Sequence, residues 1–172
     1  MPERLTLADL STLYRDAFVA AVGAVFEHSP WVMERAWEKR PFGNRAAFIT
    51  ALGDVLHEAG RELQLSLINA HPELAGKLAI RGALTTESTR EQAGAGLAAC
   101  SPEEFASLQQ LNSAYRTKFG WPFIVAVKGL SRQQIIAEMT RRIERTPDEE
   151  FAEALAQILR IASFRLDDLI AY

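Results

Sequence analysis

The residues best suited to chemistry lie around His71. This histidine stands directly before Pro72, and proline disfavours helical backbone at the residue that precedes it. We therefore expect the preceding helix, over about residues 61–70, to end near His71. An imidazole at a helix end can exchange a proton near neutral pH.

A hydroxyl, a carboxylate and an amide follow at helical spacing. Ser88, Glu91 and Gln92 are offset by three and four residues. A helix that begins at Ser88 therefore places all three at its N-terminal end. Together with His71, these groups could converge on one site for acid–base chemistry.

The same residues also have an ordinary structural interpretation. Ser88 to Glu91 reads S-x-x-E, which is the capping box that satisfies backbone N–H groups at a helix start. A single histidine such as His71 is also often a hydrogen-bonded structural residue. Spacing alone leaves both interpretations open.

The wider pattern resembles the OHCU decarboxylase family. It reads HPELAGKLA from His71 and S-x-x-E-Q-x-x-A-G-L from Ser88. Three further motifs agree in order: FEHSPWVMERAWEKRPF (Phe26 to Phe42), LNSAYRTKFGWPFIVAVKG (Leu111 to Gly129) and RIASFRLDDL (Arg160 to Leu169). The resemblance implies conversion of 2-oxo-4-hydroxy-4-carboxy-5-ureidoimidazoline (OHCU) to (S)-allantoin in urate degradation.

This resemblance suggests a mechanism that uses no cofactor. In the family's substrate the carbon that carries the carboxylate adjoins a ring imine, which can accept the electron pair that departing CO2 leaves behind. We hypothesise that His71 and Glu91 flank the 4-hydroxyl and the carboxylate, with His71 as the proton donor. Proton delivery from one face would give a single enantiomer.

Five more residues complete this hypothesis around the ring. Ser88 and Gln92 would fix the ureido and carbonyl groups, and Pro72 would supply an apolar wall. The N–H groups of Thr89 and Arg90, at the expected helix start, could stabilise negative charge on the ligand.

An apolar run from Trp121 to Val127 follows the helix that Gly120 is expected to close. From its residues alone it is core, either a buried strand or an extended segment. The family resemblance implies that its main chain lines the substrate pocket through Phe123, Ile124, Val125, Ala126 and Val127.

Arg165 falls on the inward side of the last predicted helix, between Ala162 and Leu169. A buried guanidinium needs an anionic or hydrogen-bonding partner. That partner could be an internal carboxylate or exposed carbonyls. The resembling arginine of the family contacts substrate, and so Arg165 is our predicted contact for the substrate's polar edge.

Capping signals divide the chain into helices. They predict one all-α domain over residues 1–172, a bundle of about seven to nine helices with at most one short extended segment. The expected caps are Thr6, Ser29, Asn44, Ser101, Ser131 and Thr146. We expect the first helix, which Thr6 caps, to carry apolar residues at helical spacing from Leu10 to Phe26 and to stop near Glu27.

Three arginines, Arg141, Arg142 and Arg145, gather near the end of the helix that Ser131 caps. This position is favourable for the helix dipole. We interpret the run as a solvated face.

Composition narrows the possible partners to a small-molecule substrate or another protein. The net charge of -3 gives no reason to expect nucleic acid or an anionic membrane. Cys100 is the only cysteine, which fits a reducing compartment. His28 and His57 belong to no metal-binding motif, so we predict no metal and no cofactor.

Location and assembly rest partly on the resemblance. The start of the chain has acidic residues where a signal peptide would be apolar, and its end, Ile170-Ala171-Tyr172, is not a peroxisomal tripeptide. We therefore expect a bacterial cytoplasmic protein, and the family implies a homodimer. The alternatives are a non-catalytic helical binding module and a hydrolase or isomerase of a related cyclic ureide.

Overall fold

The computed structural model describes residues 3–74, 85–97 and 100–172. The predicted Gly- and Thr-containing linker between the two halves of the His71 motif lies outside these residues. The chain forms two compact units. The first unit is Met1–Ala70 with Ile158–Tyr172, and the second unit is His71–Gln157.

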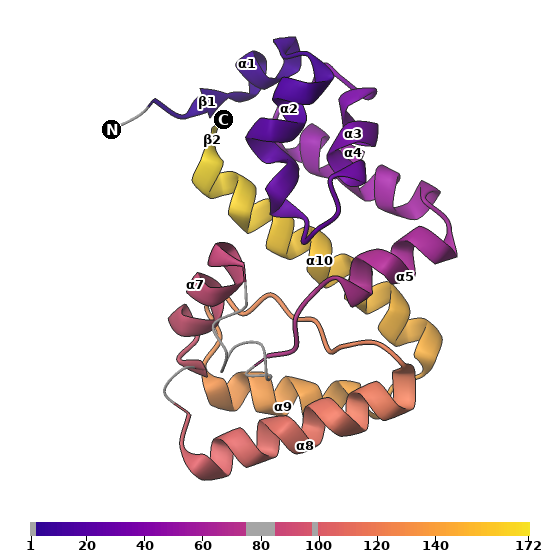
Figure 1. Ribbon diagram of the computed structural model, residues 1–172, viewed down its shortest axis with the longest axis vertical. Coiled ribbons are helices and arrows are strands. Elements are labelled where there is room, and N and C mark those ends of the chain that lie inside the picture. Colours follow the sequence, from indigo (N-terminus) through magenta and orange to yellow (C-terminus); the bar gives the residue numbers. More distant parts are fainter. Residues whose placement is uncertain (1–2, 75–84, 98–99) are drawn as a thin grey trace. The chain divides into compact units, whose positions relative to one another are not determined.

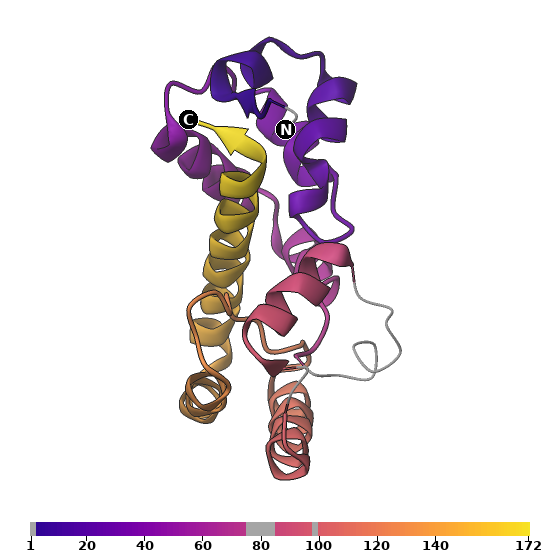
Figure 2. The same ribbon diagram turned by 90° about the vertical axis from the view of Figure 1, so that its left-hand side faces the viewer.

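Helices make up most of the described chain (Figures 1 and 2), which confirms the all-α prediction. The nine α-helices described are α1 Leu7–Thr12, α2 Arg15–Val22, α3 Trp31–Trp37, α4 Arg45–Glu58, α5 Arg61–Asn69, α7 Thr86–Gly94, α8 Pro102–Phe119, α9 Arg132–Arg142 and α10 Pro147–Leu169. The smaller elements are the 3-10 helix η1 Gly23–Val25 and the strands β1 Leu5–Thr6 and β2 Ile170–Ala171.

The prediction of a single helix from the Thr6 cap to near Glu27 is wrong. The backbone of Leu13 is extended, with φ -69° and ψ 145°, and this separates α1 from α2. Side chains from beyond the break bind the carbonyls that it exposes. Trp37 Nε1 donates to Leu13 O at 2.9 Å, and Arg40 Nη1 donates to Ser11 O at 3.2 Å. These long-range bonds make the break favourable.

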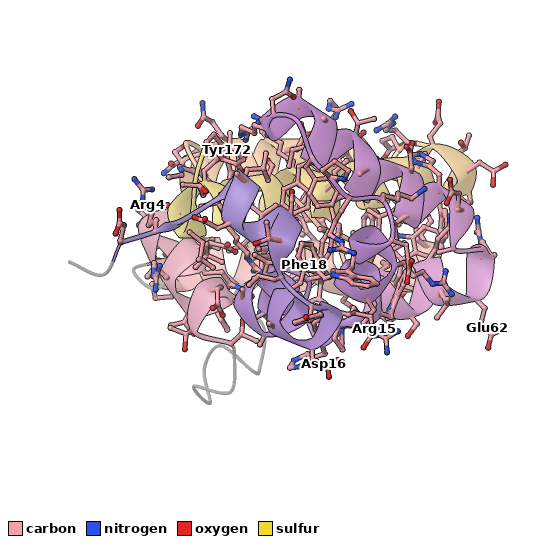
Figure 3. All side chains as sticks on the ribbon, turned by 90° about the horizontal axis from the view of Figure 1, so that it is seen from above. Arg4, Arg15, Asp16, Phe18, Glu62 and Tyr172 are labelled. Atoms are coloured by element: carbon pink, nitrogen blue, oxygen red, sulfur yellow. The ribbon has the colours of Figure 1, made fainter. Side chains whose placement is uncertain are left out.

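An aromatic cluster lies at the centre of the first unit. The ring centroids of Phe42 and Phe48 are 4.4 Å apart, and the centroid of Phe18 is 6.2 Å from that of Phe42. Figure 3 shows Phe18 among the helices, with Arg15 and Asp16 of the same helix directed outward. One face of α2 therefore packs against α3 and α4.

The two ends of the first unit pair as a short parallel sheet. Leu5 lies opposite Ile170, and Thr6 lies opposite Ala171. Figure 3 shows Arg4 and Tyr172 near the same edge. The sequence did not predict these strands, since a two-residue pairing of distant segments leaves no periodic pattern.

Most of the predicted caps are confirmed. The Oδ1 atom of Asn44 accepts from Ala47 N at 2.8 Å, and Ser101 and Ser131 each form a capping box. Thr146 Oγ1 accepts from Glu149 N at 3.3 Å at the start of α10. These bonds span three residues, which is why local sequence reveals them.

Ser29 does not cap a helix with its side chain, contrary to the prediction. Its Oγ donates to Glu27 O at 2.8 Å, and α3 begins after Pro30 without a side-chain cap. The hydroxyl is therefore used to close the turn that precedes the helix.

In the second unit the chain folds back between α8 and α9. Gly120, with φ 84°, ends α8 in the left-handed region that glycine adopts readily. Residues 121–130 then return to the start of α9 with no helix or strand assigned (Figure 1). Trp121 packs edge-on against Phe151 at 5.5 Å between centroids. The apolar run is buried core without strand pairing.

Candidate active site

The helix that leads to His71 ends as predicted. α5 stops at Asn69, and Ala70 N donates back to Ser66 O at 3.0 Å. The His71 side chain is buried, with 7% of the residue exposed. The proline that follows thus places an imidazole inside the second unit rather than on its surface.

Helix α8 anchors the turn after His71. Asn112 is buried, and its Nδ2 donates to Leu74 O at 2.8 Å. One helical turn further on, Arg116 Nε lies 2.9 Å from Glu73 Oε1. Asn112 was not among the predicted site residues, although it stands in the motif that begins at Leu111. Its signal was an amide on the mainly apolar face of a helix.

The expected start of a helix at Ser88 is wrong. α7 begins at Thr86, and Thr85 is its cap, because Thr85 Oγ1 accepts from Ser88 N at 3.2 Å. Ser88 is therefore inside the first turn, and Ser88 to Glu91 is not the capping box of α7. A threonine three residues before Ser88 was the overlooked local signal.

One face of α7 is buried. Ser88 and Gln92, four residues apart, are 4% and 7% exposed, and Glu91 beside them is half-buried. This spacing places the three polar side chains along one side of the helix. The three side chains therefore lie on one helix, in the same unit as His71.

Thr89 and Arg90 are exposed on α7. The Thr89 N–H donates to Thr85 O at 2.9 Å and so closes the first helical turn. The expectation that this N–H lies at the open start of the helix fails for that reason. Half-buried Pro72 adjoins His71.

The predicted pocket segment, Phe123–Val127, is buried along its whole length. Two of its main-chain groups are bound by helix side chains. Arg142 Nη1 donates to Ile124 O at 2.7 Å, and Ala126 N donates to Gln157 Oε1 at 2.9 Å.

Arg142 is not on a solvated face, contrary to the prediction. The residue is fully buried, and its Nε donates to Glu150 Oε1 at 2.8 Å. Tyr115 OH donates to the same oxygen at 2.7 Å. Burial, and then the hydrogen bond to Glu150, raise the pKa of Tyr115. Arg141, which directly precedes Arg142 on α9, is exposed.

Arg165 lies in the first unit and is buried with an acidic partner. Its Nη2 is 2.9 Å from Glu27 Oε1, and its Nη1 donates to Val25 O at 3.0 Å. A carboxylate or carbonyls were the expected partners of Arg165, but nothing in the sequence indicated Glu27. The two residues are 138 positions apart, so no local pattern connects them.

Among the described residues, no group of three or more His, Cys, Asp or Glu side chains has a metal-binding arrangement. In the same part of the chain, no helix has both the length and the apolar character needed to cross a bilayer. The Nδ1 atom of His57 lies 2.7 Å from Gly53 O.

Comparisons with known proteins agree on one family. The model of the OHCU decarboxylase family matches residues 11–167. A protein of Halalkalicoccus jeotgali named 2-oxo-4-hydroxy-4-carboxy-5-ureidoimidazoline decarboxylase is 41% identical over 96% of this chain and 92% of its own length. The uric acid degradation bifunctional protein of Bacillus subtilis is 38% identical over 96% of this chain, which matches only 33% of that larger protein.

A solved structure agrees in fold and sequence. The crystal structure of (S)-allantoin synthase superposes with a TM-score of 0.76 at 25% identity, over 97% of this chain. The chain spans about half of that protein, 54% of its length. Since the family model and a relative that is similar along almost its entire length agree, this chain belongs to the OHCU decarboxylase family.

Proposed function

We propose that this protein catalyses the decarboxylation of OHCU to (S)-allantoin and CO2 in urate degradation, without a cofactor. Membership of the OHCU decarboxylase family supports this activity. The observation that carries the proposal is the buried imidazole of His71 in the unit that also contains the buried polar face of α7. A proton donor and amide-binding groups are what this reaction requires.

The electron balance of the reaction needs no external electron sink. The bond between the ring carbon and the carboxylate breaks, CO2 leaves, and the ring imine next to that carbon accepts the electron pair. A proton then adds to the resulting carbon–carbon double bond at the ureido-bearing carbon. The 4-hydroxyl gives up its proton to become the carbonyl of allantoin, and the former imine nitrogen takes up a proton to become a ring N–H. The protein's part is to orient the substrate, exclude water and deliver that proton.

His71 and Glu91 carry the proton chemistry in this proposal. They flank the 4-hydroxyl and the carboxylate and hold the scissile bond near perpendicular to the ring, where it overlaps the imine. His71 donates the proton from one face, which yields a single enantiomer. Burial supports this role, since it keeps bulk water from protonating the intermediate from either side.

The remaining groups bind the ureido and ring amides. Ser88 and Gln92 offer a hydroxyl and an amide from the buried face of α7, and Pro72 supplies an apolar wall. Arg165 remains a predicted substrate contact, supported by the family resemblance. Thr89 and Arg90 remain predicted contacts near the start of α7, although the Thr89 N–H is bonded to Thr85 O.

The segment Phe123–Val127 supplies main-chain groups. In an extended backbone, successive residues direct their N–H and C=O groups to opposite sides. The groups of Ile124 and Ala126 that bind Arg142 and Gln157 face one side. Those of Phe123 and Val125 then face the other, and among the described residues no protein group bonds to them. A ring of amides would satisfy these buried groups.

The decisive test uses freshly generated OHCU with the wild type and with His71→Asn and Glu91→Gln. General acid–base assistance is worth about 100- to 10,000-fold, so we expect His71→Asn to lose activity on that scale while remaining folded. His57→Asn is the matched control, because that histidine is exposed on α4, and we expect its activity to equal that of the wild type.

Two readouts, CO2 release and the optical activity of the allantoin formed, separate the alternatives. Near-normal turnover by either site variant would remove that residue from the mechanism. Ring opening without CO2 would instead identify a hydrolase, and no consumption of OHCU by the wild type would favour a binding module.

We also propose that the chain acts as one domain and forms a homodimer in the cytoplasm. A single family model over residues 11–167 supports one functional domain. The resemblance supports the dimer, and the one cysteine fits a reducing compartment. Light scattering on the purified protein should give twice the mass of the chain, and the mass of one chain would contradict the dimer.

A further inference from the structure

The proposed chemistry leaves one buried charged cluster unexplained. It consists of Tyr115 on α8, Arg142 on α9 and Glu150 on α10, and we call it the Arg142 cluster. Arg142 and Glu150 are both fully buried. Removing two charges from water is costly, and an apolar pair of similar volume often stabilises a fold as well or better. The cluster therefore calls for a role other than stability.

Arg142 contacts the predicted pocket segment at two neighbouring residues. Its Nη1 donates to Ile124 O at 2.7 Å, and its guanidinium carbon lies 4.4 Å from the centroid of the Phe123 ring. The planar guanidinium supports both contacts while its Nε is bonded to Glu150 at 2.8 Å. A lysine side chain is flexible and ends in a single ammonium group, so it cannot contact the Ile124 carbonyl, the Phe123 ring and Glu150 at the same time.

Glu150 and Tyr115 fix the direction of this guanidinium. One oxygen of Glu150 accepts from both Tyr115 OH, at 2.7 Å, and Arg142 Nε. The other oxygen accepts from Arg145 Nη1 at 3.2 Å. Donors from α8, from α9 and from the turn after α9 therefore meet at one carboxylate of α10, and Arg142 is held with its fork toward Ile124.

A second hydrogen bond also restrains the main chain of the predicted pocket segment. Gln157, two turns along α10 from Glu150, accepts from Ala126 N at 2.9 Å and donates to Glu153 at 3.0 Å. The main-chain groups of Ile124 and Ala126 are thus fixed at both ends of a three-residue stretch. This leaves little rotational freedom to the peptide groups of Val125 between them.

We propose that Arg142 is a positioning residue of the active site, which, with Glu150 and Tyr115, holds the Ile124 carbonyl so that the main-chain groups of Phe123 and Val125 face the substrate. This inference rests on the proposed function and deepens it. This role explains why the charges of Arg142 and Glu150 are buried, because a directional hydrogen-bond donor can fix the position of a carbonyl and an apolar side chain cannot.

The first measurement does not depend on the function. Amide hydrogen exchange is followed over residues 122–128 in the wild type, in Arg142→Lys and in the control Arg141→Lys. Arg141 is adjacent on α9, but it is exposed and pairs with Glu138. We expect exchange in Arg142→Lys to be about tenfold faster or more, as for a segment that opens locally, and no change in Arg141→Lys.

The second measurement uses OHCU turnover. Partial unfolding lowers the concentration of active enzyme and so the apparent kcat, and it leaves KM unchanged. A displaced pocket wall raises KM instead. We expect KM to rise about tenfold in Arg142→Lys, which is the effect of losing one charge-assisted hydrogen bond, and we expect the KM of Arg141→Lys to match that of the wild type.

A triple variant decides the question if Arg142→Lys is recovered unfolded. Tyr115→Phe/Arg142→Met/Glu150→Leu removes the charges and the hydroxyl together and keeps an apolar core. A folded variant of either kind with unchanged KM, or with unchanged exchange over residues 122–128, would overturn the proposal. Should the wild type fail to consume OHCU, the proposed function fails, and the exchange result still shows whether Arg142 positions the segment.

Discussion

Each of the two units contains a buried arginine paired with a buried glutamate. In the first unit Arg165 lies 2.9 Å from Glu27, and in the second Arg142 lies 2.8 Å from Glu150. Each guanidinium also donates to a carbonyl outside the α-helices, at Val25 and at Ile124. A protein built of helices satisfies its helical backbone internally, and so its non-helical backbone needs donors from side chains.

In the second unit several groups depend on the acid. Glu150 accepts from Tyr115, Arg142 and Arg145, and it connects α8, α9 and α10. The bond between Glu27 and Arg165 connects residues 138 positions apart. We conclude that the pair in the second unit organises the segment proposed to line the pocket, whereas the pair in the first unit closes a long-range contact.

The largest effect on stability should come from Glu150→Ala. This change leaves the guanidinium of Arg142 buried without its carboxylate, and it also removes the acceptor of Tyr115. Breaking a buried pair in this way costs about 3–5 kcal/mol. Urea unfolding monitored by circular dichroism measures the loss. A loss below about 1 kcal/mol, as for an exposed pair, would contradict the burial of this pair.

Tyr115→Phe should have an intermediate effect that depends on pH. At neutral pH it removes a hydrogen bond to a carboxylate, worth about 1.5–3 kcal/mol. The pKa of Tyr115 is raised by burial and by Glu150, so the folded state holds the phenol proton more tightly than the unfolded state does. This stability is fully present below the ordinary tyrosine pKa of about 10 and decreases as the pH rises above that value.

Unfolding of the wild type and of Tyr115→Phe at pH 8, 10 and 11 measures this dependence. The stability advantage of the wild type should shrink above about pH 10, by at most about 1.4 kcal/mol per pH unit. A constant difference across this range would show that the phenol is not buried beside a charge. The other tyrosines are present in both proteins, so their titration cancels.

The smallest effect should come from an exposed pair of similar geometry. Arg45 and Asp167 form two hydrogen bonds, of 2.7 and 2.8 Å, and their side chains are 42% and 34% exposed. Water and salt screen such pairs, and we expect Asp167→Asn to cost less than about 1 kcal/mol. The loss should decrease in 1 M salt when measured by urea unfolding. A loss as large as that of Glu150→Ala would mean that burial does not explain the contrast.

The sequence was most informative where interactions are local. The caps at Asn44, Ser101, Ser131 and Thr146 each join residues three positions apart. Local sequence also located the end of α5 before His71, because Pro72 acts on the residue next to it. The same reasoning failed at Ser88, where two overlapping cap signals competed and Thr85 formed the cap.

Long-range contacts decided what the sequence could not. The break at Leu13 is stabilised by Trp37 and Arg40, and β1 pairs with β2 from the other end of the chain. These bonds join distant residues and leave no periodic trace. Grouping Ser88, Glu91 and Gln92 needed only helical spacing, whereas identifying Glu27 as the partner of Arg165 needed the fold.

The sequence by itself therefore determined the all-α class, most helix starts and the family. Only the tertiary structure decided which charges are buried. Arg141 and Arg142 are neighbours with the same side chain, yet one is exposed and the other fully buried. The reason is that burial depends on which helices surround a position, and α8 and α10 surround Arg142 through residues that no local pattern connects.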